Sequence, residues 1–240
     1  MVMPPTFKGF IGDILSHLFP HCCLICGDRS DLSMEICSCC QNELPKVGHH
    51  CYQCGLPLPH SQTICGACLH KPPPFDQTIA PFLYQPPFDH LIGQLKFQQK
   101  LHHAKLLAQL LVKEIPQYID QRPQLIIPVP LHHKRQRQRG YNQALEILRP
   151  LAQALEIPIA TNITQRHRET AEQSKLKARE RRKNIRGAFT VDQHGIPDHI
   201  ALFDDVITTS STVRELAMTF KHAGVSRVDV WAVTRAVPYQ

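Results

Sequence analysis

The chain has 240 residues, a formal net charge of +7 at pH 7 and 42% hydrophobic residues. This length accommodates one α/β domain together with a small accessory module. No apolar run reaches the roughly 18 residues that a transmembrane helix needs, so we expect no insertion into a membrane. All ten cysteines lie between Cys22 and Cys68, which confines any disulfide or thiolate–metal site to the first third of the chain.

Residues 1–20 are mildly apolar but include Asp13 and His17. A secretory signal peptide has a basic n-region and a small-residue cleavage site, and this stretch has neither. We therefore expect a cytoplasmic protein whose first residues form a short amphipathic helix or a loose tail.

Four Cys-x-x-Cys pairs begin at residues 23, 37, 51 and 65, a constant spacing of 14 residues. Two intervening residues let both thiolates of a tight turn reach one tetrahedral Zn²⁺. Eight ligands predict about two structural zinc ions per chain. The predicted ligands are Cys23, Cys26, Cys37, Cys40, Cys51, Cys54, Cys65 and Cys68.

The equal spacing alone does not decide which pairs share an ion. Glycine follows the first pair (Cys26-Gly27) and the third pair (Cys54-Gly55), but neither the second nor the fourth. The pattern is that of a unit repeated twice. It favours zinc sites made by the first and second pairs and by the third and fourth pairs.

Two cysteines and three histidines leave alternatives open. Cys22 and Cys39 lie outside the four pairs and are surplus to them, while His21, His49 and His50 could replace a thiolate or lie at the surface. A disulfide framework is the other account of the cysteines. It requires an oxidising compartment, which nothing else in the sequence implies.

Prolines separate the cysteine region from the rest of the chain. Residues 71–74 read Lys-Pro-Pro-Pro, and such a run cannot continue a helix. We expect an N-terminal tail and zinc module over 1–70, a Pro-rich linker over 71–87 and a second domain over 88–240. In that domain, apolar residues at helical spacing predict core-facing helices near 88–95 and 101–111, and Lys96 beside them is expected to be solvated.

The remaining residues alternate between strand and helix patterns. Buried strands are expected at 124–130, 188–191, 200–203 and 227–237, short strands within 157–164, and helices at 141–155 and from 213 to 223. Residues 131–140 and 166–186 are expected to be charged loops. This alternation predicts an α/β fold with a mainly parallel twisted sheet and flanking helices, whose ligands bind at the carboxyl ends of the strands.

Positive charge is concentrated in the two loops. The first has a net charge of +4 from Lys134, Arg135, Arg137 and Arg139. The second includes Arg179, Arg181 and Arg182 and has nine basic and three acidic residues between Arg166 and Arg186. Such localised charge favours binding of a polyanion, although each run could also be a solvated face.

Residues 200–212 combine an apolar strand, two acids and a hydroxyl-rich turn. Asp204 and Asp205 follow the strand, and a helix follows the turn. The N–H groups of such a turn and the helix dipole favour a phosphate, while carboxylates accept hydrogen bonds from ribose hydroxyls. The alternative is a strand end followed by ordinary N-caps. The hydroxyl residues are Thr208, Thr209, Ser210, Ser211 and Thr212.

These thirteen residues resemble the phosphoribosyl-pyrophosphate (PRPP) signature of type I phosphoribosyltransferases. The resemblance implies that Asp204 and Asp205 hold the ribose 2′- and 3′-hydroxyls during catalysis and that the turn wraps the 5′-phosphate. Ser210 stands where that family usually has glycine. A Cβ makes a positive φ more costly and narrows the space between the backbone and the phosphate.

Further motifs extend the resemblance over nearly the whole chain. Together they resemble the ComF family of competence-related proteins, in which a zinc module precedes a type I phosphoribosyltransferase domain. The motifs are Pro128-Val129-Pro130, Arg139-Gly140-Tyr141-Asn142-Gln143, Gln173, Leu176, Arg179-Glu180-Arg181, Asn184 and Gly187-Ala188-Phe189.

The resemblance implies two functions. One is a phosphoribosyltransferase that binds PRPP with Mg²⁺, releases pyrophosphate and transfers phosphoribose to a base or nucleotide, in the context of DNA uptake or utilisation. The other is a non-catalytic protein that binds PRPP or single-stranded DNA and assists DNA-uptake proteins. By its position after the first strand, the basic segment Lys134 to Arg139 suits pyrophosphate, and the 166–186 loop could close over the site and add positive charge. The acceptor and the oligomeric state are open.

Overall fold

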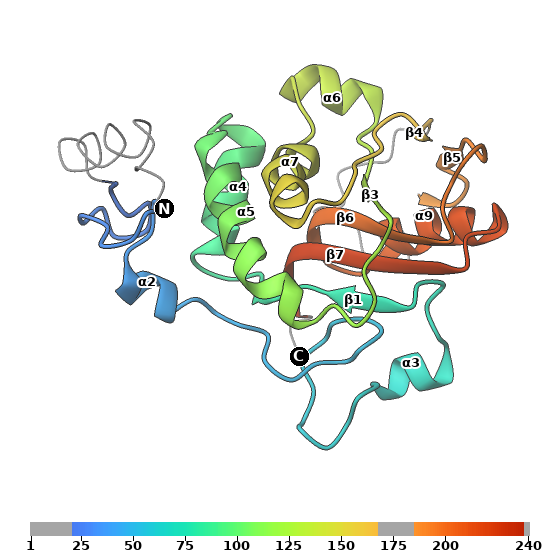
Figure 1. Cartoon of the computed structure of the whole chain (residues 1–240), viewed down its shortest axis with the longest axis horizontal. Coiled ribbons are helices and arrows are strands. Elements are labelled where there is room, and N and C mark those ends of the chain that lie inside the picture. Colours follow the sequence, from blue (N-terminus) through green and yellow to red (C-terminus); the bar gives the residue numbers. More distant parts are fainter. Residues whose placement is uncertain (1–20, 168–184, 238–240) are drawn as a thin grey trace, which may run out of the picture. The chain divides into compact units, whose positions relative to one another are not determined.

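The computed structural model describes residues 21–167 and 185–237 of the chain (Figure 1). It divides into two units, Met1–Leu44 and Pro45–Gln240. The expected N-terminal tail and most of the second basic loop, including Arg179, Arg181 and Arg182, lie outside the described residues. Within the described ranges, no helix is both long enough and apolar enough to cross a membrane.

The described part of the first unit is a small cysteine-rich module. Its described part contains the helix α2 (Ser38–Asn42), which begins after Cys37. The sulfur of Cys37 accepts a hydrogen bond from the backbone N–H of Cys40. The backbone N–H of Leu24 donates to the carbonyl oxygen of Glu35 at 2.9 Å and closes the module on itself.

The second unit is built on a five-stranded sheet of β1 (Gln77–Ile79), β2 (Phe82–Leu83), β3 (Leu125–Pro128), β6 (His199–Ile207) and β7 (Arg227–Arg235). Its order is β1-β7-β6-β3, with β2 also paired to β7 (Figure 1). Every pairing in this sheet is parallel. The carboxyl ends of β3, β6 and β7 therefore lie at one edge.

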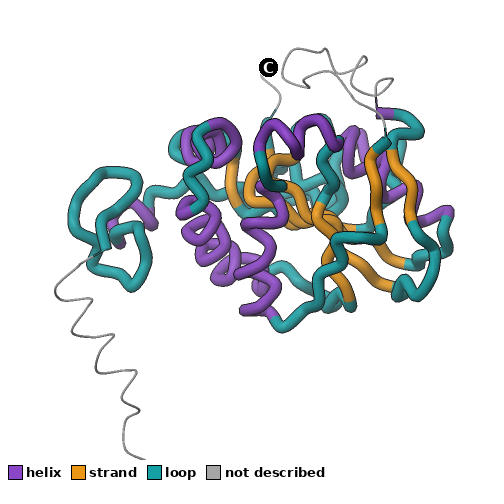
Figure 2. Tube along the Cα trace, turned by 90° about the horizontal axis from the view of Figure 1, so that it is seen from above, coloured by secondary structure: helices purple, strands orange, loops and turns teal. Residues whose placement is uncertain are grey.

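Two helices show how the sheet is covered on both faces. From α9 (Ser211–His222), Val213 and Phe220 pack into one cluster with Leu202 and Val230 of the strands. Trp231 is buried on the opposite face, because successive strand residues alternate. On the other side of β3 and β6 lies α7 (Gln143–Leu155). Figure 2 shows the strands in the interior of this unit with helices around them.

Two further α-helices and a 3₁₀ turn precede β3 in the chain. Helix α4 (Phe88–Phe97) is followed by α5 (His102–Glu114) and by the 3₁₀ turn η1 (Ile115–Gln117). Helix α5 packs on both α4 and α7. The predicted helices and the predicted strands near 125, 200 and 227 are all present, so the α/β fold with a parallel sheet is confirmed.

The stretch 71–87, expected to be a linker, instead contributes β1 and β2 to the sheet. Between its prolines, Phe75, Ile79 and Phe82 are buried, and this apolar content outweighs the prolines, which lie outside both strands. The division between the units at Leu44 also differs from the expected boundary at residue 70.

Two smaller elements differ from expectation. The basic stretch 131–140, expected to be a loop, contains the short helix α6 (His133–Arg139), which ends at Gly140 with φ of 81°. Strand β4 (Thr164–Arg166) pairs antiparallel with β5 (Phe189–Val191) in a separate two-stranded sheet.

Candidate functional site

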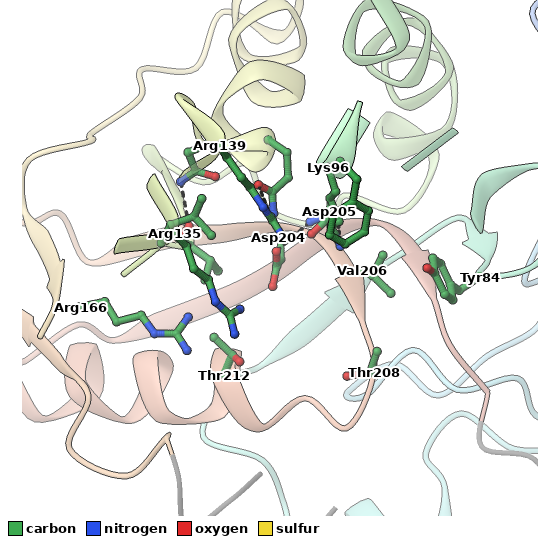
Figure 3. Close-up of a pocket in the computed structure, with 15 residues that line it drawn as sticks. Tyr84, Lys96, Arg135, Arg139, Arg166, Asp204, Asp205, Val206, Thr208 and Thr212 are labelled. Atoms are coloured by element: carbon green, nitrogen blue, oxygen red, sulfur yellow. Dashed lines mark hydrogen bonds and ion pairs between the residues drawn. The ribbon is translucent and has the colours of Figure 1, made fainter. Parts of the chain in front are cut away.

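A pocket of about 360 Å³ opens at the carboxyl edge of the sheet (Figure 3). The two acids Asp204 and Asp205 border it from the end of β6, and the hydroxyl residues Thr208 and Thr212 border it from the turn into α9. Cationic side chains from three other segments border the same space. Residues that are far apart in the sequence thus meet where the resemblance placed a ligand.

The two acids have different surroundings. Asp205 is 3% exposed, while Asp204 is half-buried and borders the pocket. The Nζ atom of Lys96 forms an ion pair with Oδ2 of Asp205. Burial raises the pKa of the Asp205 carboxyl, but the charge and hydrogen bond of Lys96, together with Asp204 and Arg139, outweigh burial and lower that pKa. Burial, and then the charge of Asp205, raise the pKa of Asp204 well above its ordinary value.

Lys96 is a site residue that the sequence interpretation missed. Its side chain is only 21% exposed, so the expectation that it is solvated is wrong. It lies one turn after Ile92 on the buried stripe of α4, and a lysine at such a position was the available signal. Its buried counterion is 109 positions away in sequence, and no local pattern joins the two.

Helix α6 directs part of the first basic segment into the pocket. Arg135 and Arg139 are four residues apart, so they share one face of the helix, and both are half-buried and border the pocket. Lys134 and Arg137 are exposed and are not among the described residues that line it. Two of the four predicted cations are therefore at the site, and two are not.

Asn142 fixes the position of this segment. Its Nδ2 donates to the carbonyl oxygen of Val129 at 3.0 Å, and its Oδ1 accepts from the backbone N–H of Ala144 at 3.0 Å. One side chain therefore starts α7 and ties it to the end of β3. This contact gives a structural role to the Asn142 of the family motif.

Arg166 is a further cation that was not singled out as a site residue. It ends β4, is 8% exposed and borders the pocket. Burial and the neighbouring Arg135 lower the pKa of Arg166 to about 10, so its guanidinium stays protonated at pH 7. Figure 3 shows Arg135 and Arg166 on one side of Asp204, with Tyr84 on the other.

The hydroxyl turn has the backbone geometry that glycine favours. Ser210 has φ of 58°, in the left-handed region, and it immediately precedes α9. The Oγ1 of Thr209 and the Oγ of Ser211 lie 2.8 Å apart. Ser210 and Ser211 are buried beside a small adjoining cavity that Asp204 also borders. The N-terminus of α9 is thus beside the acids and can hold an anion there.

The eight paired cysteines form two four-sulfur groups, Cys23/Cys26/Cys37/Cys40 (the first cluster) and Cys51/Cys54/Cys65/Cys68 (the second cluster). Within each group the sulfurs lie within 4.8 Å of one another. The Sγ–Sγ distances are 3.8 Å for Cys26–Cys37 and 3.7 Å for Cys54–Cys65.

These spacings fit structural zinc. A tetrahedral ion with Zn–S bonds of about 2.3 Å places its sulfurs about 3.8 Å apart. The predicted pairing is confirmed, and the two groups are compatible with about two zinc ions. Cys22 and Cys39 are exposed and belong to neither cluster. The second cluster, unlike the first, is buried throughout, and α3 (Gly66–His70) carries its last ligand.

Known proteins similar to this chain decide its family. Residues 14–69 match the double zinc ribbon domain. A DNA utilization protein YhgH of Escherichia coli O157:H7 is 37% identical over 225 residues, covering 91% of this chain and 98% of that protein. Competence protein F of Haemophilus influenzae is 35% identical over 230 residues, covering 92% and 100%. The chain belongs to the ComF family.

Solved structures similar to this ComF-family chain include two phosphoribosyl-pyrophosphate-related enzymes. A glutamine PRPP amidotransferase from B. subtilis is 17% identical with a TM-score of 0.35, covering 54% of this chain and 26% of that chain. An adenine phosphoribosyltransferase from Leishmania donovani is 14% identical with a TM-score of 0.36, covering 57% and 55%.

Proposed function

We propose that this ComF-family protein binds PRPP together with Mg²⁺ in the pocket at the carboxyl edge of the sheet. One observation carries the proposal: an acid pair, a helix N-terminus and three arginines from two separate segments surround the same space. PRPP presents ribose hydroxyls, a 5′-phosphate and a diphosphate. These groups match the acids, the turn and the arginines respectively.

Each part of the ligand has a defined partner in this arrangement. Backbone N–H groups and hydroxyls of residues 208–212 suit the 5′-phosphate, and Asp204 accepts from the ribose hydroxyls. Arg135, Arg139 and Arg166 offer charge-assisted hydrogen bonds to the diphosphate. Mg²⁺, held by diphosphate oxygens beside Asp204, would supply further positive charge to the leaving pyrophosphate.

Phosphoribosyl transfer is the reaction that such binding supports. The bond between ribose C1 and the diphosphate oxygen breaks, its electron pair leaves with pyrophosphate, and the acceptor's lone pair forms the new bond to C1. Positive charge develops on the ribose and negative charge on the leaving group. The arginines stabilise the negative charge on the leaving pyrophosphate, and the Asp204 carboxylate stabilises the positive charge on the ribose.

A binding titration and a product assay test this proposal in sequence. We expect calorimetry to detect PRPP binding in the presence of Mg²⁺, with weaker binding of ribose 5-phosphate and of pyrophosphate, since each offers only part of the contact set. Pyrophosphate release in the presence of a panel of bases and nucleotides then separates a transferase from a binding protein. Absence of PRPP binding by the zinc-loaded wild type would refute the site assignment.

Two exposed aromatic side chains favour binding of single-stranded DNA as a second candidate function. Phe97 is 70% exposed and Tyr84 is 38% exposed, and both border the pocket. The guanidinium of Arg139 lies 5.4 Å from the centre of the Phe97 ring. The basic segments 131–140 and 166–186 contain no Phe, Tyr or Trp, and the fold brings these two rings to the pocket from other segments. Aromatic rings beside cations are the elements of a base-stacking platform.

Replacing Phe97 with alanine should weaken binding of an oligothymidylate by about 5- to 150-fold, because one base stack contributes about 1–3 kcal/mol. An abasic oligonucleotide of equal length keeps the phosphates but has nothing to stack. Its weaker, salt-sensitive binding should not change in Phe97→Ala. Met218→Ala, which removes an exposed apolar side chain outside the pocket lining, is the matched control. Equal losses for both oligonucleotides would contradict the stacking account.

A further inference from the structure

Arg235 connects the second cluster to the hydroxyl turn. It is the last residue of β7 and is 4% exposed. Its Nε donates to the carbonyl oxygen of Cys54 at 2.9 Å, and its Nη1 donates to the carbonyl oxygens of Ile207 at 2.9 Å and of Thr208. One guanidinium therefore binds a predicted zinc ligand at one end and the residues that begin the turn at the other.

The charge of Arg235 makes this connection sensitive to the metal. A buried guanidinium needs compensation, yet among the described residues no carboxylate forms an ion pair with Arg235. A Zn²⁺ ion with four thiolates has a formal charge of about −2, and such a cluster lies directly behind the Cys54 carbonyl. Loss of the ion would let the thiolates take up protons, which would remove the compensating negative charge as well as the fold of the cysteine turns.

The packing around the cysteine turn is tight at the same point. Gly55 follows Cys54 with φ of +69°, and a Cβ there would lie 2.9 Å from Cγ2 of Thr78 and 3.6 Å from Cδ of Arg235. The corresponding residue of the first cluster, Gly27, has φ of +83° and would have no atom within 4 Å of a Cβ. The two glycines have the same backbone conformation and differ in what surrounds them.

Further hydrogen bonds join the residues around the second cluster to other parts of the second unit. Thr78 of β1 donates its backbone N–H to the Tyr52 carbonyl oxygen at 2.9 Å and its Oγ1 to the Gln53 carbonyl oxygen at 2.6 Å. At the opposite end of β7 from Arg235, the Tyr52 hydroxyl donates to Asp120 at 2.7 Å and lies 3.3 Å from Nη2 of Arg227. Only the Arg235 end reaches the turn.

We propose that Arg235 is a positioning residue through which the second cluster holds the 208–212 turn in its PRPP-binding conformation. The inference rests on the proposed PRPP site and assigns that site a dependence on one of the two clusters. The second cluster then has a functional role as well as a structural one, and the first cluster has no part in PRPP affinity.

The two glycines provide a matched test by PRPP calorimetry on the zinc-loaded full chain. Gly55→Ala should lower PRPP affinity about tenfold or more, equivalent to about 1.4 kcal/mol. Its Cβ would clash with Cγ2 of Thr78, so the turn must shift together with the Cys54 carbonyl oxygen that Arg235 binds. Gly27→Ala has the same backbone strain and should stay within about twofold of wild type. Arg235→Met should lower PRPP affinity at least as much as Gly55→Ala does. Arg235→Lys keeps the charge but has one nitrogen in place of three, so its PRPP affinity should lie between those of wild type and Arg235→Met.

Three controls separate positioning from loss of fold. Elemental analysis should give two zinc ions in each glycine variant, and thermal melts define a temperature at which all variants are folded. Tyr52→Phe loosens the other end of the cluster and should cost stability without reducing PRPP affinity. If Arg235→Met fails to fold, the PRPP affinity of Gly55→Ala compared with that of Gly27→Ala decides whether the inference holds. Unchanged affinity in Gly55→Ala, or equal losses in both glycine variants, would overturn the inference, whereas a wild type that binds no PRPP refutes the site itself.

Discussion

Cys65→Ser should destabilise the whole second unit, whereas Cys37→Ser should unfold only the cysteine-rich part of the first. Both changes remove one of four zinc ligands, and structural zinc contributes an apparent folding free energy of about 10–16 kcal/mol in small zinc domains. The second cluster is buried and is bound to β1 and β7 through Thr78 and Arg235. Its loss therefore removes contacts from the central sheet.

The sole tryptophan reports on this difference. Trp231 is buried in β7, so its emission follows the sheet of the second unit. We expect the melting temperature seen by Trp231 to fall sharply in Cys65→Ser and to change little in Cys37→Ser, with each variant losing about one zinc ion by elemental analysis. Equal shifts in the two variants would show that the second cluster does not support the sheet.

Lys96→Met should destabilise the second unit by about 3 kcal/mol, the lower end of the range for breaking a buried ion pair from one side. The substitution removes the counterion of Asp205 and leaves two adjacent carboxylates at the end of β6. Both acids then favour protonation, so the loss of stability should grow as the pH rises from 5 to 8. Chemical denaturation across this range measures the effect.

A double variant and a surface variant serve as controls. Lys96→Met combined with Asp205→Asn removes both charges of the ion pair and should recover most of the lost stability, because no unpaired charge remains at position 205. Lys105→Met, at an exposed position of α5, should change stability by no more than about 0.5 kcal/mol. A single Lys96→Met variant as stable as wild type would mean that the ion pair does not compensate the acids.

Local patterns predicted the elements whose causes are local. The spacing of the cysteines, together with Gly27 and Gly55, predicted both four-sulfur groups, and apolar periodicity predicted the main strands and helices. Ser210, which stands where the resembled family usually has glycine, has a positive φ in the structure. In each case neighbouring residues determine the geometry.

Features that depend on distant contacts were not predictable in this way. Lys96 and Arg166 join the pocket only because α4 and β4 lie beside the end of β6 in the fold. The prolines near residue 71 suggested a domain boundary, but the contacts of Thr78 and Arg235 place the second cluster in the same unit as the sheet. The equal repeat of the cysteine pairs contains no sign that the two clusters belong to different units.

The raised pKa of Asp204 makes the stability of the protein depend on pH. When a carboxyl has a higher pKa in the folded than in the unfolded state, stability falls as the pH rises from the ordinary value of 3.8 through the raised one. The Asp204 carboxyl therefore costs stability at pH 7. Asp204→Asn should melt at a higher temperature than wild type at pH 7, and this gain should shrink as the pH is lowered toward 4.

Calorimetric titration of PRPP, with Mg²⁺, into wild type and Asp204→Asn at pH 7 tests the central claim most directly. The variant keeps the shape of the side chain and replaces the carboxylate that accepts hydrogen bonds from the ribose hydroxyls with a neutral amide. One lost hydrogen bond to a charged group costs about 1.5–3 kcal/mol, so affinity should fall about tenfold to a hundredfold while the protein becomes more stable. PRPP binding of equal strength in both proteins would contradict the assignment of the pocket.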